Sequence, residues 1–184
     1  MAWLARLLLR LGGWRLVSTR PPALQKYLVV FYPHTSNWDF VLGILAAWAL
    51  RLELTFLAKH SLFEGPLGPL MRGLGGHPVR RDERSNMVTQ VAALVAGRER
   101  IVLALAPEGT RSRGEHWRSG FYYIAREAHL PVVPAFLDTR SRTLGLGPPV
   151  YLTGDVQADM AQLRAFYADK RGLRPELASP VLLR

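Results

Sequence analysis

Short apolar runs alternate with longer apolar runs along this chain, and this alternation constrains its fold more than any other feature. Residues 27–32 are aromatic or branched and predict a buried strand, which Pro33 should end because proline cannot extend a central ladder. Residues 38–50 are almost wholly apolar and predict a buried helix. The alternation continues, with strands expected at residues 54–58, 101–106, 132–137 and weakly at 150–152, and a short extended piece at 78–82. Helices are expected at residues 85–97, 119–128 and 158–170.

Strands that alternate with helices predict an α/β fold, with a largely parallel central sheet flanked by helices. A chain of 184 residues suits a single domain with a sizeable core. Pro134 interrupts the run 132–137, so we expect that strand to lie at an edge or to contain a bulge. We divide the chain into a basic N-terminal segment, residues 1–26, and a domain of residues 27–184.

The N-terminal segment is basic and rich in leucine and tryptophan. Arg6, Arg10 and Arg15 interrupt it too often for a bilayer-spanning helix or the apolar core of a secretory signal. A basic amphipathic helix with tryptophan is typical of the membrane interface, where apolar side chains enter the acyl boundary and arginines stay among headgroups. The alternative is a helix that packs on the core and has ordinary solvated arginines.

The formal net charge is +10, which favours anionic partners: nucleic acid, a membrane surface or phosphorylated substrates. No helix-turn-helix signal, zinc-finger spacing or aromatic RNA-binding signature accompanies the charge, so we expect no nucleic-acid partner. The absence of cysteine excludes disulfides, thiol nucleophiles and thiolate metal sites. His60 and Glu64 have the spacing of a helical metal pair, but the glycines and prolines that follow argue against a helix, and we expect no metal.

His34 and Asp39 lie between the first predicted strand and the helix that follows it. His34 should occupy the loop at the carboxyl end of the strand, where open α/β sheets usually bind ligands. Two interpretations stay open. In one, Ser36 to Asp39 form a capping box and His34 is only a loop histidine. In the other, Asp39 accepts a hydrogen bond from one imidazole nitrogen, and the other nitrogen takes a proton from a substrate hydroxyl.

A second polar cluster, Glu108 to Arg111, follows the predicted strand 101–106. Gly109 permits a positive φ or a close approach to a ligand, and the planar guanidinium of Arg111 suits a phosphate group. Glu108 has the chemistry to hold a hydroxyl or to organise the arginines. The alternative is an ordinary turn with solvated charges.

Further cations also follow predicted strands. Lys59 comes after residues 54–58, and the adjacent Arg80 and Arg81 should point in opposite directions in extended chain, so that only one faces the site. Together with His34 and Glu108, these residues predict a site for a phosphorylated substrate that carries a hydroxyl.

Four blocks of residues, in this order, resemble the glycerolipid acyltransferase family, which includes the lysophosphatidic acid and glycerol-3-phosphate acyltransferases. The blocks are His34 with Asp39; Gly75, Pro78, Val79 and Arg81; Glu108 to Arg111; and Leu-Pro-Val-Val-Pro at residues 130–134. Pro33 stands where members often have asparagine, and proline replaces the usual aromatic residue of the second block. The match selects Arg81 over Arg80.

The resemblance implies O-acyl transfer from acyl-CoA or acyl-carrier protein to a lysophospholipid-type acceptor, expected to be 1-acyl-sn-glycerol 3-phosphate, in phospholipid biosynthesis. It implies that His34 is the general base, that Asp39 orients it, and that the substrate is bound by Lys59, Arg81, Glu108, Gly109, Thr110 and Arg111. No cofactor beyond the co-substrate is implied. We expect a peripheral or monotopic position on the cytoplasmic face of a membrane. The alternatives are an acyltransferase for another lysolipid and a non-enzymatic basic protein that binds membrane or nucleic acid.

Overall fold

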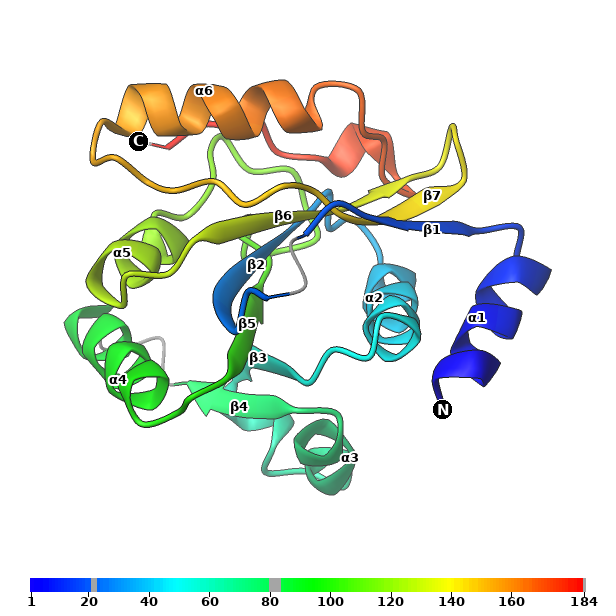
Figure 1. Ribbon diagram of the computed structural model, residues 1–184, viewed down its shortest axis with the longest axis horizontal. Coiled ribbons are helices and arrows are strands. Elements are labelled where there is room, and N and C mark those ends of the chain that lie inside the picture. Colours follow the sequence, from blue (N-terminus) through cyan, green and yellow to red (C-terminus); the bar gives the residue numbers. More distant parts are fainter. Residues whose placement is uncertain (21–22, 80–83, 184) are drawn as a thin grey trace.

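The computed structural model describes residues 1–20, 23–79 and 84–183, and it leaves the side chains of Lys59, Val79 and residues 84–87 undescribed. Its centre is a seven-stranded sheet in the order β1-β7-β6-β2-β5-β3-β4, shown in Figure 1. The strands are β1 (Arg15–Ser18), β2 (Lys26–Tyr32), β3 (Leu54–Lys59), β4 (Gly76–Val79), β5 (Ile101–Leu105), β6 (Val132–Asp138) and β7 (Thr143–Leu146). The helices are α1 (Ala2–Leu11), α2 (Asn37–Ala49), α3 (Gly68–Gly73), α4 (Arg84–Ala96), α5 (Gly120–Glu127) and α6 (Val156–Tyr167), with short 3₁₀ turns η1 (His60–Leu62) and η2 (Pro175–Leu177).

The sheet is largely parallel: β6 and β7 pair antiparallel, and the other neighbouring strands pair parallel. The two faces are covered by different helices (Figure 1). On β2, Leu28 and Val30 point into a core shared with α4, α5 and α6, whereas Tyr27 and Val29 belong to the opposite face, as the two-residue period of a strand requires. The predicted α/β fold is confirmed, and burial on both faces explains why these strands are apolar throughout.

The prediction that residues 132–137 form an edge or bulged strand is wrong. β6 is buried along its whole length and lies between β2 and β7. The carbonyl of Pro134 accepts a hydrogen bond from Gly147 N, just beyond the end of β7. The N–H and C=O of one strand residue point to the same side, so the missing N–H of Pro134 faces away from β2. It therefore does not interrupt the parallel hydrogen bonds between β2 and β6.

Two strands were missed by the sequence analysis, and one was predicted where none forms. β1 and β7 are four-residue strands on the same side of the sheet. The weak strand expected at residues 150–152 is instead a single antiparallel bridge between Val150 and Val132. Short strands next to glycine and arginine carry little periodic signal, which is why the pattern did not separate them.

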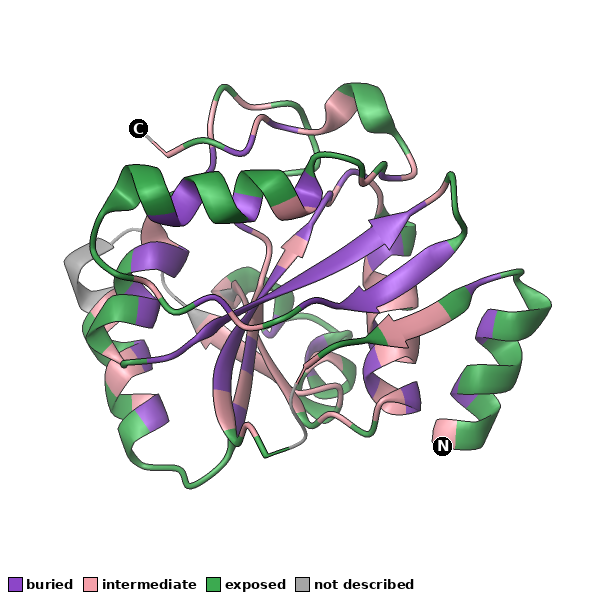
Figure 2. Ribbon diagram, turned by 45° about the horizontal axis from the view of Figure 1, so that its top comes forward, coloured by how far each residue is buried: buried purple, intermediate pink, exposed green. Residues whose placement is uncertain are grey.

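The N-terminal segment contains both a helix and a strand. α1 ends at Leu11, and Gly13 (φ 74°) turns the chain into β1, which pairs with β7. Ala5 and Leu9 are the buried residues through which α1 packs on the core, and Figure 2 shows most of its surface exposed. Among the described residues, no helix is both long enough and apolar enough to cross a membrane.

The adjacency of β2 and β5 positions the predicted site. These strands pair parallel from Lys26–Ile101 to Val30–Leu105, so their carboxyl ends meet at one edge of the sheet. The loop after β2 carries His34, and the loop after β5 carries Glu108. We define the C-terminal segment as residues 168–183, which follow α6. This segment lies at the same edge of the sheet, where its main chain donates hydrogen bonds to side chains of both loops.

Candidate active site

His34 lies two residues beyond the end of β2, with its Nδ1 atom 3.5 Å from Asp39 Oδ2. The Nδ1 atom is buried and has no hydrogen-bond partner among the described residues, whereas 18% of the side chain is exposed. The exposed part of the side chain therefore lies away from Nδ1. The Phe31 ring packs edge-on against the imidazole, with centroids 6.0 Å apart, and supports it from the β2 side.

Asp39 takes part in a capping box at the start of α2, and its carboxylate also lies next to His34. Its Oδ2 atom accepts hydrogen bonds from Thr35 N (2.6 Å) and Ser36 N (2.7 Å), while the Ser36 side chain accepts from Trp38 N. The capping box at the start of α2 is therefore confirmed. The same Oδ2 atom faces His34, and the Asp39 side chain is fully buried. A carboxylate fixed by two main-chain donors holds a negative charge behind the imidazole; that it orients His34 for catalysis stays a prediction.

Glu108 is buried beneath the site, only 4% exposed, and joins two segments that are remote in sequence. Its Oε2 atom accepts a hydrogen bond from His34 N at 2.6 Å, and its Oε1 atom accepts from Ser179 N at 2.8 Å. Burial raises the pKa of the Glu108 carboxyl, and the two main-chain hydrogen bonds oppose this increase only in part. In this structure both carboxyl oxygens bind the protein itself, so Glu108 supports the His34 loop from below.

Ser179 fastens the C-terminal segment to the site by three hydrogen bonds. Besides the bond from its N–H to Glu108, its carbonyl accepts from Tyr32 Oη at 3.0 Å, and its Oγ atom accepts from Gly114 N at 3.0 Å. Burial, followed by the charge of Glu108, raises the pKa of Tyr32 to about 12. The phenol therefore stays protonated and remains a donor.

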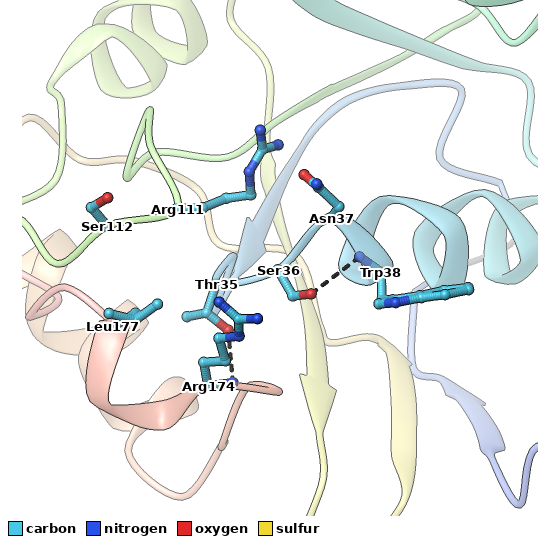
Figure 3. Close-up of a pocket in the computed structure, with 8 residues that line it drawn as sticks. All are labelled: Thr35, Ser36, Asn37, Trp38, Arg111, Ser112, Arg174 and Leu177. Carbon is cyan, nitrogen blue, oxygen red and sulfur yellow. Dashed lines mark hydrogen bonds between the residues drawn. The ribbon is translucent and has the colours of Figure 1, made fainter.

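Of the other residues of the predicted second cluster, Arg111 lines a pocket of about 410 Å³, whereas Gly109 and Thr110 are not among its described lining residues. Gly109 adopts φ 66°, and the loop then turns at Thr110, whose Oγ1 atom accepts a hydrogen bond from Ser112 N. Arg111 is exposed and lines the pocket (Figure 3). The other lining residues come from the start of α2, the loop after β5 and the C-terminal segment: Thr35, Ser36, Asn37, Trp38, Ser112, Arg174 and Leu177.

Two of the predicted cations cannot be placed. Arg81 lies outside the described residues, and so does the side chain of Lys59, although its backbone ends β3. Gly75 of the same block has φ 92° and lies so close to β3 that a Cβ atom would be 1.9 Å from Leu54 O. His60 Nδ1 and Glu64 Oε1 form an exposed contact of 3.0 Å. In the part of the chain that the structure describes, no group of three or more histidine or acidic side chains could hold a metal ion.

The sequence analysis missed three residues of the site, namely Thr35, Arg174 and Ser179. Thr35 is 1% exposed, and its Oγ1 atom accepts a hydrogen bond from Arg174 N at 3.1 Å. Because Thr35 follows His34 directly in the sequence, its membership of the site could have been predicted. Arg174 and Ser179 lie in irregular chain about 140 residues beyond His34, and no motif marks them.

Comparison with known proteins supports the resemblance. A sequence profile described as Acyltransferase matches residues 17–138. The 1-acyl-sn-glycerol-3-phosphate acyltransferase of Salmonella typhimurium is 28% identical over 144 residues, which cover 74% of this chain and 58% of that protein. The human 1-acyl-sn-glycerol-3-phosphate acyltransferase beta is 25% identical over 169 residues, which cover 88% of this chain and 60% of that protein. The chain therefore spans less than two thirds of the length of these relatives.

The fold also has a solved counterpart. The crystal structure of the 1-acyl-sn-glycerophosphate (LPA) acyltransferase PlsC from Thermotoga maritima superposes with a TM-score of 0.57 at 15% identity, covering 90% of this chain and 74% of that one. At this identity the likeness concerns the fold alone. The sequence profile covers most of the chain and includes the loops that bring His34, Asp39 and Glu108 together. This chain belongs to the acyltransferase family.

Proposed function

We propose that the chain transfers a fatty acyl group from acyl-CoA or acyl-carrier protein to the hydroxyl of 1-acyl-sn-glycerol 3-phosphate, giving phosphatidic acid. The observation that carries this proposal is the arrangement of His34, whose Nδ1 atom is buried 3.5 Å from a fully buried carboxylate while 18% of its side chain is exposed. A partly exposed imidazole backed by a fixed negative charge suits a general base. The names of the relatives support the choice of acceptor.

His34 would take the proton of the acceptor hydroxyl as the hydroxyl oxygen attacks the carbonyl carbon of the thioester. The tetrahedral intermediate then expels the thiolate, and the proton held by His34 passes to the sulfur. The carbon–oxygen ester bond has formed and the carbon–sulfur bond has broken, with no acyl-enzyme in between. A direct transfer of this kind needs no cysteine, and the sequence contains none. Asp39 would stabilise the imidazolium between the two proton transfers.

Cations near the pocket would hold the phosphate group of the acceptor. Arg111 lines the pocket, and Arg81 and Lys59 are proposed as further phosphate-binding cations. Gly109 and Thr110 would lie beside the glycerol part. The geometry of Glu108, with both oxygens occupied by main-chain donors, favours support of the loop over a contact with the glycerol.

We further propose that α1 holds the protein on the cytoplasmic face of a membrane, where both the lipid acceptor and the product reside. Leu4, Leu7, Leu8 and Leu11 form a stripe at helical spacing and are 42–75% exposed, and Trp3 beside them is 71% exposed. Ala5 and Leu9, on another side of the helix, are the positions that pack on the core. A helix with one apolar stripe on the protein and another left exposed suits the headgroup boundary of a bilayer.

The test is a transferase assay with labelled acyl-CoA or acyl-carrier protein and a panel of lysolipids, comparing the wild type with His34→Ala. We expect the variant to lose about 10²–10⁴-fold in rate, the usual contribution of a positioned general base. Circular dichroism should show an unchanged fold, because the imidazole makes no hydrogen bond among the described residues. A folded variant that transfers at the wild-type rate would refute the mechanism. Preference for another lysolipid would correct the acceptor and leave the chemistry standing.

A further inference from the structure

We propose that Arg174, in the C-terminal segment, binds a substrate phosphate together with Arg111. This inference rests on the proposed function, since it assigns a residue to the substrate pocket of that reaction. The segment lies outside residues 17–138, which the family profile matches, and none of the four sequence blocks includes it. The assignment therefore comes from the position of Arg174 in the folded chain.

The pocket has the composition of an anion site. Arg111 enters it from the loop after β5 and Arg174 from the C-terminal segment (Figure 3), and no carboxylate is among the described residues that line it. Neither arginine forms an ion pair with a described acidic side chain. The hydroxyl of Ser36 accepts a hydrogen bond from Trp38 N and still has its own hydrogen to donate. The start of α2 also lines the pocket, and the N-terminus of a helix favours an anion.

The main chain around Arg174 is fixed next to the proposed base. Arg174 N donates a hydrogen bond to Oγ1 of the buried Thr35, which follows His34 in the sequence. Gly172 packs so closely on this loop that a Cβ atom would be 2.9 Å from Thr35 Oγ1. Arg174 as a residue is exposed and lines the pocket, so its positive charge is accessible while its main chain is held in place.

The chemistry of the acceptor explains why a cation is needed at this position. In 1-acyl-sn-glycerol 3-phosphate, the phosphate is attached to the carbon next to the one that carries the reacting hydroxyl. When that hydroxyl meets His34, the phosphate must lie within a few bonds of it. A guanidinium anchored beside Thr35 is close to that location, and its planar fork suits phosphate oxygens. The alternative source of the phosphate is the nucleotide part of acyl-CoA.

The experiment compares the wild type, Arg174→Gln and Arg174→Lys, with Arg171→Gln as the matched control. Arg171 is an exposed arginine of the same segment that does not line the pocket. The hydrogen bond to Thr35 comes from the main chain of Arg174, so these side-chain changes leave it intact. The kinetic assays use two acceptors, 1-hexanoyl-sn-glycerol 3-phosphate and 1-hexanoylglycerol, and two donors, acyl-CoA and acyl-pantetheine. The binding of each acceptor without donor is also measured by titration calorimetry.

We expect Arg174→Gln to raise the KM of the phosphorylated acceptor about ten- to hundredfold, the range for losing a hydrogen bond to a charged group, with kcat changed far less. Arg174→Lys should recover part of the loss because it retains the charge, and the phosphate-free acceptor should be unaffected. A rise confined to acyl-CoA, and absent with acyl-pantetheine, would assign the phosphate to the donor. Unchanged kinetics with every substrate, or equal effects with and without phosphate, would overturn the inference.

The two proposals fail in different ways. If the wild type transfers no acyl group to any acceptor but still binds the phosphorylated acceptor in an Arg174-dependent manner, the proposed function is wrong and the phosphate site stands. If transfer is normal and neither KM nor calorimetric affinity depends on Arg174, the phosphate site is wrong and the proposed function stands.

Discussion

Replacing Glu108 by alanine would test whether this carboxylate holds the site together. The wild-type side chain accepts two hydrogen bonds, from His34 N at 2.6 Å and from Ser179 N at 2.8 Å, at a position that is 4% exposed. Alanine leaves both main-chain donors without their acceptor. Each unsatisfied buried donor costs about 1–3 kcal/mol, and removal of a buried charge returns part of that cost. We therefore expect the free energy of unfolding to fall by about 2–4 kcal/mol.

Differential scanning calorimetry measures this effect directly. For a domain of this size, each kcal/mol shifts Tm by about 2–4 °C, so we expect a decrease of about 4–16 °C. Glu115→Gln serves as the control, because Glu115 is exposed in the loop that follows. Transfer activity should decrease as well, since the His34 loop loses its support. A change in the free energy of unfolding below about 1 kcal/mol would show that Glu108 does not hold the two segments together.

The pH dependence of stability provides a second check on Glu108. Burial raises the pKa of its carboxyl in the folded protein, so the native state binds this proton more tightly than the unfolded state does. The stabilising contribution of this group is therefore fully present below the unfolded pKa and is lost as the pH rises through the raised folded pKa. Glu108→Gln is of similar size and does not titrate. The free energy of unfolding of the wild type should rise relative to that of this variant as the pH falls from 7 toward the ordinary pKa range of glutamate. If the difference between the two free energies did not change with pH, the raised pKa of Glu108 would be contradicted.

Two further predictions concern the second sequence block and α1. Gly75→Ala should lower the free energy of unfolding by about 2–4 kcal/mol, because φ is 92° and a Cβ atom would lie 1.9 Å from Leu54 O. In chemical denaturation Gly73→Ala, which has open space around its Cβ position, should stay near the wild type, and equal losses would contradict this reasoning. The double variant Leu7→Ser/Leu11→Ser should bind anionic vesicles about 30-fold more weakly, which corresponds to about 1 kcal/mol for each part-exposed leucine. Co-sedimentation with the vesicles measures this binding, and Tyr151→Ser, which alters an exposed aromatic residue elsewhere, is the control. Unchanged binding by the double variant would refute an anchoring role for α1.

The elements that could be predicted from the sequence were those with a strong local pattern. β2 and α2 are long and apolar, and Pro33 separates them, so their bounds were close to those observed. β6 was located correctly, but its place in the sheet was not, because Pro134 was assumed to disturb the pairing with neighbouring strands, whereas it pairs opposite Val30 and its backbone edge faces Gly147. Sheet order depends on long-range pairing, which single-strand patterns do not encode.

The same distinction between local and long-range contacts applies to the site. His34 and Asp39 are five residues apart on one strand–helix connection, so their approach follows from local geometry that the sequence reveals. The contacts of Arg174 with Thr35 and of Ser179 with Glu108 cross 139 and 71 residues. In both contacts the donor is a main-chain N–H group, which every residue except proline possesses. The residue types in the sequence therefore do not indicate these contacts. The negative charge beside His34 thus comes from Asp39, a residue close in sequence, whereas the position of the His34 loop depends on the distant C-terminal segment.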